Sequence, residues 1–401
     1  MIRVEEAEKI IQSQACDYGM ESIYFENAAG RVLAENITAD RDLPPYNRVT
    51  MDGIAVRYEA FEKGKRSFKI KAVQAAGDVP VDIENDNECI EIMTGAALPS
   101  TTDTVIPYEH IDIKDCLATA KHAIAVNKGQ SIHYKGRDKL QGDVLVPAGC
   151  VIDPVVINIA AALGKTEMAV KKLPRIVIIS TGDELAAVNE TPLPYQVRRS
   201  NNYAIKATLE EYGITPGMLH LPDNHAVIKQ ELKTCLDNYD VILLSGGISM
   251  GKFDYVPQVL DELAVKKLFH KVQQRPGKPF WFGTHANGAV VFAFPGNPVS
   301  TYMCLHRYCI PWLKASTGIK NRETFAVLNT DFVFTPALQY FLQVELQVYG
   351  NGQIMANPLV GNGSGDFANL AEAGAFMELP LERNDFKKGE VFRIWPFRKI
   401  Y

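Results

Sequence analysis

Three short, largely apolar runs after Pro174 constrain the fold of this chain most. The runs RIVIIS, VILLS and VVFAF occupy residues 175–180, 241–245 and 290–294, and segments with helical spacing of apolar residues lie between them. Strands that are apolar on both faces and joined by helices are typical of a parallel, doubly wound α/β sheet. We therefore predict such a sheet, in which ligands bind at the carboxyl ends of the strands.

The end of each run brings glycine and polar side chains to the same predicted edge. Glycine lets backbone N–H groups approach an anion, and a following helix N-terminus adds positive charge. Taken singly, each ending is more typical of a turn or a helix cap. Three endings in one sheet instead favour a phosphate-binding site. Its candidate residues are Thr181, Gly182 and Asp183, then Ser245, Gly246, Gly247 and Ser249, and finally Pro295, Gly296, Asn297, Pro298 and Ser300.

Charged side chains follow the same strands. The turn RPGKP carries Arg275 and Lys278, which could clamp further anionic groups. Carboxylates crowded at one mouth repel one another, and a cation such as Mg²⁺ relieves that repulsion. The sequence therefore predicts phosphate and metal together at this edge. The carboxylates concerned are Asp183, Glu184, Asp223 and Asp254.

The rest of the chain divides into regions by the spacing of its apolar residues. Apolar residues Val4, Ala7, Ile10 and Ile11 recur at helical spacing, whereas β-rich runs alternate with turns between about 43 and 148. We predict a split helical domain (1–43 with 144–172) and an inserted β-rich domain (44–143). An α/β domain (173–318) and a C-terminal β domain (319–401) follow.

Composition limits the class of protein. A chain of 401 residues with 47% hydrophobic and 22% charged residues is typical of a multidomain globular protein. A net charge of −5 argues against a general nucleic-acid or anionic-membrane surface. The seven cysteines include no CxxC pair, and the N-terminus is acidic and helical in period. We expect a cytoplasmic protein that binds neither nucleic acid nor membrane.

Eight motifs in order carry a family resemblance: PPYNRVTMDGIAV, IMTGAALP, GRDKLQGDVLVPAG, STGDEL, LLSGGISMGKFD, RPGKPFWFG, FPGNPVS and GNGSGDFANLAEA. Together they span essentially the whole chain. The sequence resembles the molybdopterin molybdotransferases of the MoeA and gephyrin E-domain family. The resemblance implies a MogA-like α/β domain, a split helical domain with a β insertion, and a small C-terminal β-barrel-like domain. It also implies a homodimer with a site shared between chains.

The resemblance further implies the reaction and its residues. Molybdate is inserted into the dithiolene of adenylylated molybdopterin, with Mg²⁺-assisted loss of AMP, and other cofactor-biosynthesis proteins are possible partners. Ser300 and Ser364 match serines near an oxyanion pocket, and Asp223 matches a binding residue. The implied metal ligands are Asp52, Glu184, Asp223 and Asp254. The implied catalytic residues are Asp52, Thr94, Asp138, Glu184, Asp254 and Lys278.

The chain departs from the family pattern at four places, one of them three residues long. Arg48-Val49-Thr50 precedes the MDG turn in place of Asn-Ser-Ala, Arg137 replaces a Glu, Arg275 a Lys, and Gln343 an Arg. Arg137 and Gln343 support an alternative, a non-catalytic molybdopterin-binding or scaffold paralogue. A generic Mg²⁺ nucleotide hydrolase is disfavoured because no GxxxxGK[ST] loop is present. Molybdate and tungstate fit the sequence equally.

Overall fold

A computed structural model describes residues 1–248 and 254–400. Contacts divide the chain into two compact units, which are described separately below. The larger comprises Met1–Ala34, Gly149–Ile157 and Glu167–Tyr401, and the smaller comprises Glu35–Ala148 and Asn158–Thr166. The division into four domains made from the sequence stays a prediction. In the part of the chain that the structure describes, no helix is long and apolar enough to cross a membrane.

A six-stranded sheet forms the centre of the larger unit, in the order β16-β13-β17-β21-β20-β18. The first four strands run parallel, which confirms the prediction for the three apolar runs. The other two strands, which the sequence did not reveal, complete the sheet as an antiparallel pair. The bounds are β13 Ile176–Thr181, β16 Gly217–Leu221, β17 Val241–Ser245, β18 Lys266–Lys271, β20 Pro279–Thr284 and β21 Val290–Phe294.

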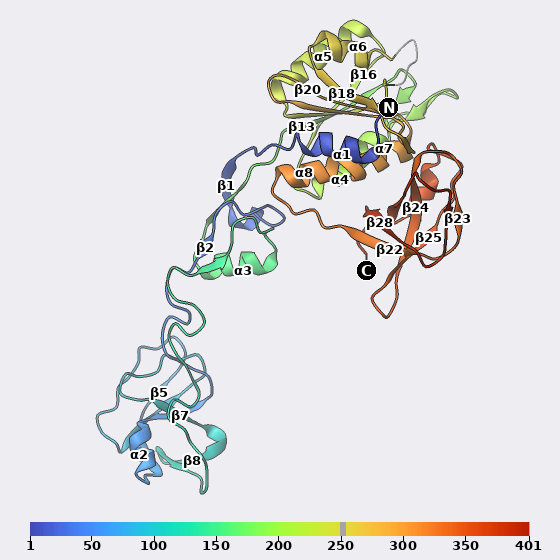
Figure 1. Cartoon of the computed structure of the whole chain (residues 1–401). Coiled ribbons are helices and arrows are strands. Elements are labelled where there is room, and N and C mark those ends of the chain that lie inside the picture. The colour runs from blue at the N-terminus through green and yellow to red at the C-terminus, as the bar shows by residue number, and fades with distance from the viewer. Residues whose placement is uncertain (249–253, 401) are drawn as a thin grey trace. The chain divides into compact units, whose positions relative to one another are not determined.

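Helices cover both faces of this sheet (Figure 1). Alternate residues of β13 point to opposite faces, so Ile176 and Ile178 join one core cluster while Val177 and Ile179 join the other. The first cluster contains buried residues of α1, α4, α7 and α8, and the second contains those of α5 and α6. The bounds are α1 Val4–Gln12, α4 Asn201–Glu210, α5 His225–Asn238, α6 Val256–Glu262, α7 Pro298–Cys304 and α8 Ile310–Ser316.

The N-terminal helix confirms its predicted periodicity. Val4, Ala7 and Ile11 are buried on one face of α1, and that face packs into the first core cluster of the α/β sheet. After α1 the chain forms β1 (Met20–Tyr24), which pairs antiparallel with β12 (Glu167–Lys171). A further helix, α3, spans Pro154–Ala162.

The C-terminal part is a small barrel. Five strands close in the order β24-β25-β22-β28-β26 because β26 also pairs with β24. A sixth, two-residue strand, β19 (Gln274–Arg275), adds to β24 from the α/β part of the chain. The segment DFANLAEAG contains a short 3₁₀ helix, η4 (Phe367–Ala371). The barrel strands are β22 Thr324–Leu328, β24 Gln339–Val348, β25 Ile354–Pro358, β26 Ala375–Leu379 and β28 Val391–Pro396.

The smaller unit is built on a second six-stranded sheet, in the order β7-β4-β6-β5-β9-β8. Two of the β-rich runs expected between 43 and 148 form β5 (SFKIKAVQ) and β6 (ECIEI). Short pairs β2–β11 and β3–β10 lie outside this sheet. The bounds are β2 Ile37–Thr38, β3 Arg48–Val49, β4 Gly53–Val56, β5 Ser67–Gln74, β6 Glu88–Ile92, β7 Thr104–Pro107, β8 Ile111–Lys114, β9 Leu117–Ala120, β10 Ile132–His133 and β11 Val144–Val146.

Candidate functional site

The three predicted strand ends do meet at one edge of the sheet. Ser245 lies in register between Ser180 of β13 and Phe294 of β21. The chain then turns sharply at Gly246, whose φ is +95°, and at Gly247, whose φ is +67°. A Cβ on Gly247 would lie 2.5 Å from the Thr181 hydroxyl oxygen, so the turn requires glycine there. The predicted Ser249 lies outside the described residues.

Asn201 ties these strand ends together, a role that the sequence did not reveal. Its side-chain amide donates to the Ser245 hydroxyl at 2.9 Å and to the Gly296 carbonyl at 2.8 Å. Asn201 is the first residue of α4, and the preceding Ser200 makes no side-chain capping bond. The polar residue at the start of α4 therefore braces the site instead of capping the helix.

A cavity of about 720 Å³ opens at this edge. Arg198 and Arg199, which the sequence analysis missed, bring positive charge to it. Their Nε atoms donate to the carbonyls of Glu190 and Ala186, which orients both guanidinium groups. The predicted residues that line this cavity are Thr181, Glu184, Ser245, Gly246, Gly296, Asn297 and Pro298.

Acidic residues gather beside the strand ends. The backbone N–H of Asp223 donates to the Asp183 carboxylate at 3.1 Å, and the N–H of Asp183 donates back to Asp223 at 3.4 Å. Burial raises the pKa of the Asp223 carboxyl, and the charges of Asp183, Glu184 and Asp254 raise it further. These carboxylates therefore lie close enough for their negative charges to repel one another. Within residues 1–248 and 254–400, however, no group of three or more acidic, histidine or cysteine side chains is arranged to hold a metal ion.

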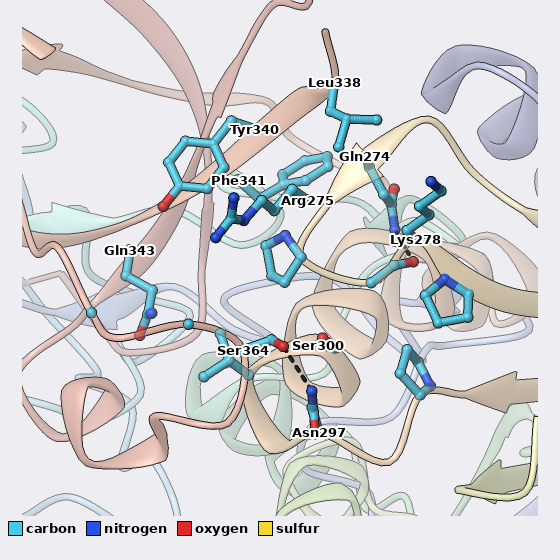
Figure 2. A pocket seen from close by; sticks show the side chains of 17 residues that line it. Gln274, Arg275, Lys278, Asn297, Ser300, Leu338, Tyr340, Phe341, Gln343 and Ser364 are labelled. Carbon is cyan, nitrogen blue, oxygen red and sulfur yellow. Dashed lines mark hydrogen bonds between the residues drawn. The ribbon is translucent and has the colours of Figure 1, made fainter. Parts of the chain in front are cut away.

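A second cavity, of about 420 Å³, lies between the α/β part and the barrel (Figure 2). Arg275 and Lys278 reach it from one turn, and Ser300, only 3% exposed, reaches it from α7. Ser364 also lines the cavity and accepts a hydrogen bond from the Asn297 amide at 2.8 Å. Two cations and two hydroxyls so arranged can bind an oxyanion. Asn297 lines both cavities, so the two adjoin.

Gln343 stands in the wall of the second cavity, where the family pattern leads us to expect arginine (Figure 2). It lies on β24 and is only 8% exposed. Its side-chain oxygen is buried and has no hydrogen-bond partner among the described residues. A buried acceptor without a donor is costly, so this position is poised to interact with something that enters the cavity.

In the smaller unit the structure brings Asp52 and Thr94 together. The Thr94 backbone N–H donates to the Asp52 carboxylate at 2.6 Å, and this bond is the main cause that lowers the pKa of Asp52. This hydrogen bond therefore favours the ionised form of the carboxylate.

Asp138 belongs to a different group of the smaller unit. Its carboxylate lies 2.8 Å from His133 Nε2, while Arg48 Nη2 lies 3.2 Å from His133 Nδ1. Because arginine can only donate, Nδ1 accepts and Nε2 carries the proton that is donated to Asp138. The family departure at Arg48 thus orients a predicted site residue through His133.

Models of known families match three consecutive regions of the chain. Residues 2–164 match the MoeA N-terminal region (domain I and II), residues 177–315 match the "Probable molybdopterin binding domain", and residues 326–397 match the MoeA C-terminal region (domain IV).

Full-length relatives agree with these matches. A molybdopterin molybdenumtransferase of Synechocystis sp. is 39% identical over 394 residues, which cover 98% of this chain and 99% of the relative. A molybdopterin molybdenumtransferase of Staphylococcus epidermidis is 30% identical, over 97% of this chain and 94% of the relative. The crystal structure of a molybdopterin biosynthesis MoeA protein from Pyrococcus horikosii superposes over 100% of both chains, with a TM-score of 0.85 and 26% identity. The fold and the sequence together show that this chain belongs to the MoeA family of molybdopterin molybdenumtransferases.

Proposed function

We propose that the chain inserts molybdenum from molybdate into adenylylated molybdopterin and releases AMP, a step of molybdenum cofactor biosynthesis. The observation that carries the proposal is the pair of adjoining cavities that share Asn297. One offers glycine turns and arginines to a phosphorylated ligand, and the other offers two cations and two hydroxyls to an oxyanion. Holding two reactants side by side replaces a slow encounter with an intramolecular step.

The cavity at the strand ends is the proposed site of the nucleotide-pterin. The strand end at Ser245 and Gly246, together with Arg198 and Arg199, suits an anionic phosphoanhydride. Asn201 keeps the Ser245 and Gly296 ends at fixed separation and so orients the ligand.

The cavity beside the barrel is the proposed oxyanion site. Molybdate is a tetrahedral dianion, and Arg275 and Lys278 would neutralise it while Ser300 and Ser364 donate hydrogen bonds. The wall position Gln343 supplies no positive charge. We therefore propose that the turn at 275–278 carries most of the charge needed for molybdate.

Mg²⁺ is proposed as the metal cofactor, with Glu184, Asp223 and Asp254 as ligands in the larger unit and Asp52 in the smaller. Support comes from the donor chemistry, since carboxylate oxygens are what Mg²⁺ prefers. It also comes from the neighbouring carboxylate charges, which add to the rise that burial causes in the pKa of Asp223. When bound, the metal would withdraw negative charge from the phosphoanhydride.

We further propose a cytoplasmic homodimer whose reaction site takes residues from both chains. Family membership is the support for the dimer, as it is for possible contacts with other cofactor-biosynthesis proteins. All seven cysteines are free thiols, which is typical of a reducing compartment.

Measurement of AMP release from adenylylated molybdopterin, with and without molybdate, tests the proposal. We expect release that requires molybdate and yields molybdenum cofactor. Binding of the nucleotide-pterin without AMP release would instead support the non-catalytic paralogue, which the neutral Gln343 favours. AMP release at the same rate with and without molybdate would indicate a hydrolase. That result would contradict both the transferase and the non-catalytic paralogue.

A further inference from the structure

The turn that carries Arg275 and Lys278 is held by a buried amide, that of Gln274, which also lines the oxyanion cavity (Figure 2). Gln274, which is fully buried, donates from Nε2 to the Gly277 carbonyl at 2.9 Å. Its Oε1 accepts a hydrogen bond from the Tyr308 hydroxyl. Tyr308 is 1% exposed and lies in the π-helical segment η3 (Leu305–Cys309) between α7 and α8. A chain of two hydrogen bonds therefore joins Tyr308 to the turn.

The Tyr308 hydroxyl determines which way the Gln274 amide faces. With the tyrosine donating to Oε1, the amide N–H points at the Gly277 carbonyl. A flipped amide would put two carbonyl oxygens in contact and leave Gly277 without its donor. Burial raises the pKa of Tyr308 well above its usual value, so the hydroxyl keeps its proton at any pH at which the protein works.

The turn has little freedom on the side that faces Gln274. Gly277 has a φ of +81°, and a Cβ there would lie 2.7 Å from Cys304 Sγ and 3.0 Å from Gln274 Nε2. The backbone thus packs directly onto the amide and onto α7. On its other side, Gln274 lies in register with Gln339 of β24, and Arg275 lies beside Tyr340.

We propose that Tyr308 is a positioning residue for the oxyanion cavity: through Gln274 it fixes the turn that presents Arg275 and Lys278 to molybdate. Tyr308 itself does not line the cavity. The inference rests on the proposed function, because it gives the two cations an oxyanion to bind. Charged donors act over short distances, and a displacement of about 1 Å in such a group can cost ~100-fold in rate.

Tyr308→Phe tests this inference, because it removes only the hydroxyl and keeps the ring, which packs 5.0 Å from Phe280. In this variant the buried Gln274 Oε1 loses its donor, so the turn with Arg275 and Lys278 is no longer fixed. We expect the molybdate KM, and the Kd for molybdate in calorimetry, to rise about tenfold. The KM for adenylylated molybdopterin should stay unchanged. A matched control is Tyr18→Phe, since the Tyr18 hydroxyl is also buried but has no partner among the described residues. This control should leave both constants unchanged.

A double-mutant cycle separates positioning from general destabilisation. Gln274→Leu should also raise the Kd for molybdate, and the double variant should be no weaker than the worse single variant, because both changes break one chain of bonds. Multiplying effects, or a fall in kcat with both KM values unchanged, would overturn the proposal. If Tyr308→Phe does not fold, Gln274→Leu still tests the proposal, because it removes the hydrogen bond to the Gly277 carbonyl directly.

The calorimetric readout keeps this inference distinct from the proposed function. If the wild-type protein binds molybdate but releases no AMP, the proposed reaction is wrong. The predicted rise in the Kd for molybdate in Tyr308→Phe can still be measured and can still confirm or contradict the positioning role. If the wild-type protein binds no molybdate, the positioning role is overturned as well.

Discussion

At the level of single residues, Asp254 carries the clearest prediction for the metal. It contributes to the raised pKa of Asp223, so it lies within electrostatic reach of the acidic group at the strand ends. We expect Asp254→Asn to remove most Mg²⁺-dependent AMP release, because one ligand charge is lost, and to leave the thermal unfolding midpoint unchanged. Turnover within about twofold of the wild type, under the same Mg²⁺ titration, would exclude Asp254 as a ligand.

Gln343 allows a test in which a substitution is expected to improve the use of molybdate. Replacing this 8% exposed side chain by arginine would return a forked, charge-assisted donor to the oxyanion cavity. We predict that Gln343→Arg lowers the molybdate concentration needed for half-maximal rate. Gln343→Met, of similar size and uncharged, is the matched control. An unchanged requirement in the arginine variant would mean that Arg275 already supplies the charge.

Among the helices, α4 contributes to the site through its first residue. Asn201→Ala removes the amide that bridges Ser245 and Gly296, so we expect a loss of about 2 kcal/mol in the free energy of unfolding. The KM for adenylylated molybdopterin should also rise. Denaturant unfolding and initial rates measure the two effects. Tyr203→Ala, an exposed position of the same helix, should change neither.

Helices α5 and α6 are joined by an acid-sensitive contact. Glu262 of α6 binds Lys229, Gln258 and His225, and these hydrogen bonds lower its pKa from 4.5 to about 2, with Lys229 the largest cause. A carboxyl whose pKa is lower in the folded state stabilises the fold above pH 4.5, and this stabilisation is lost as the pH falls towards 2.

We therefore predict that Glu262→Gln is less stable than the wild type at neutral pH and that the difference shrinks as the pH falls from 4.5 to 2. Urea unfolding at a series of pH values measures it. A difference that stays constant across this range would show that the carboxylate charge is not the cause.

The limits of sequence prediction are visible in the same elements. The strands β13, β17 and β21 were predictable because both faces of a central parallel strand must be apolar. The strand β18 (KKLFHK) was not, because only two adjacent apolar residues stand between two exposed lysines and a His-Lys pair. Asn201 resembles a local helix cap, whereas its bonding partners lie 44 and 95 residues away. Arg198 and Arg199 stand in no recognisable motif, so only the fold brings them to the cavity.

For the whole molecule, the dimer proposal makes a quantitative prediction. Asp52 belongs to the smaller compact unit and Asp254 to the larger. If one chain supplies Asp52 and its partner supplies Asp254, a dimer mixing Asp52→Asn and Asp254→Asn chains has one site with both lesions and one with none. Such mixed dimers, purified with two tags, should recover up to about half of the wild-type activity.

The homodimers of each variant are the controls and should be nearly inactive. Recovery in the mixed dimer requires that both variants remain dimeric, which size-exclusion chromatography checks. A verified mixed dimer with no recovery would mean that each site is completed within one chain.

The two-residue strand β19 has a consequence for motion within the larger unit. It pairs with β24, and the Gln339 backbone N–H donates to the Gln273 carbonyl at 3.1 Å, so the barrel is fastened to the α/β part beside the oxyanion cavity. Hinge opening there would have to break main-chain hydrogen bonds at every turnover. We expect instead an entrance of constant width, through which molybdate passes by exchanging its water shell for protein donors.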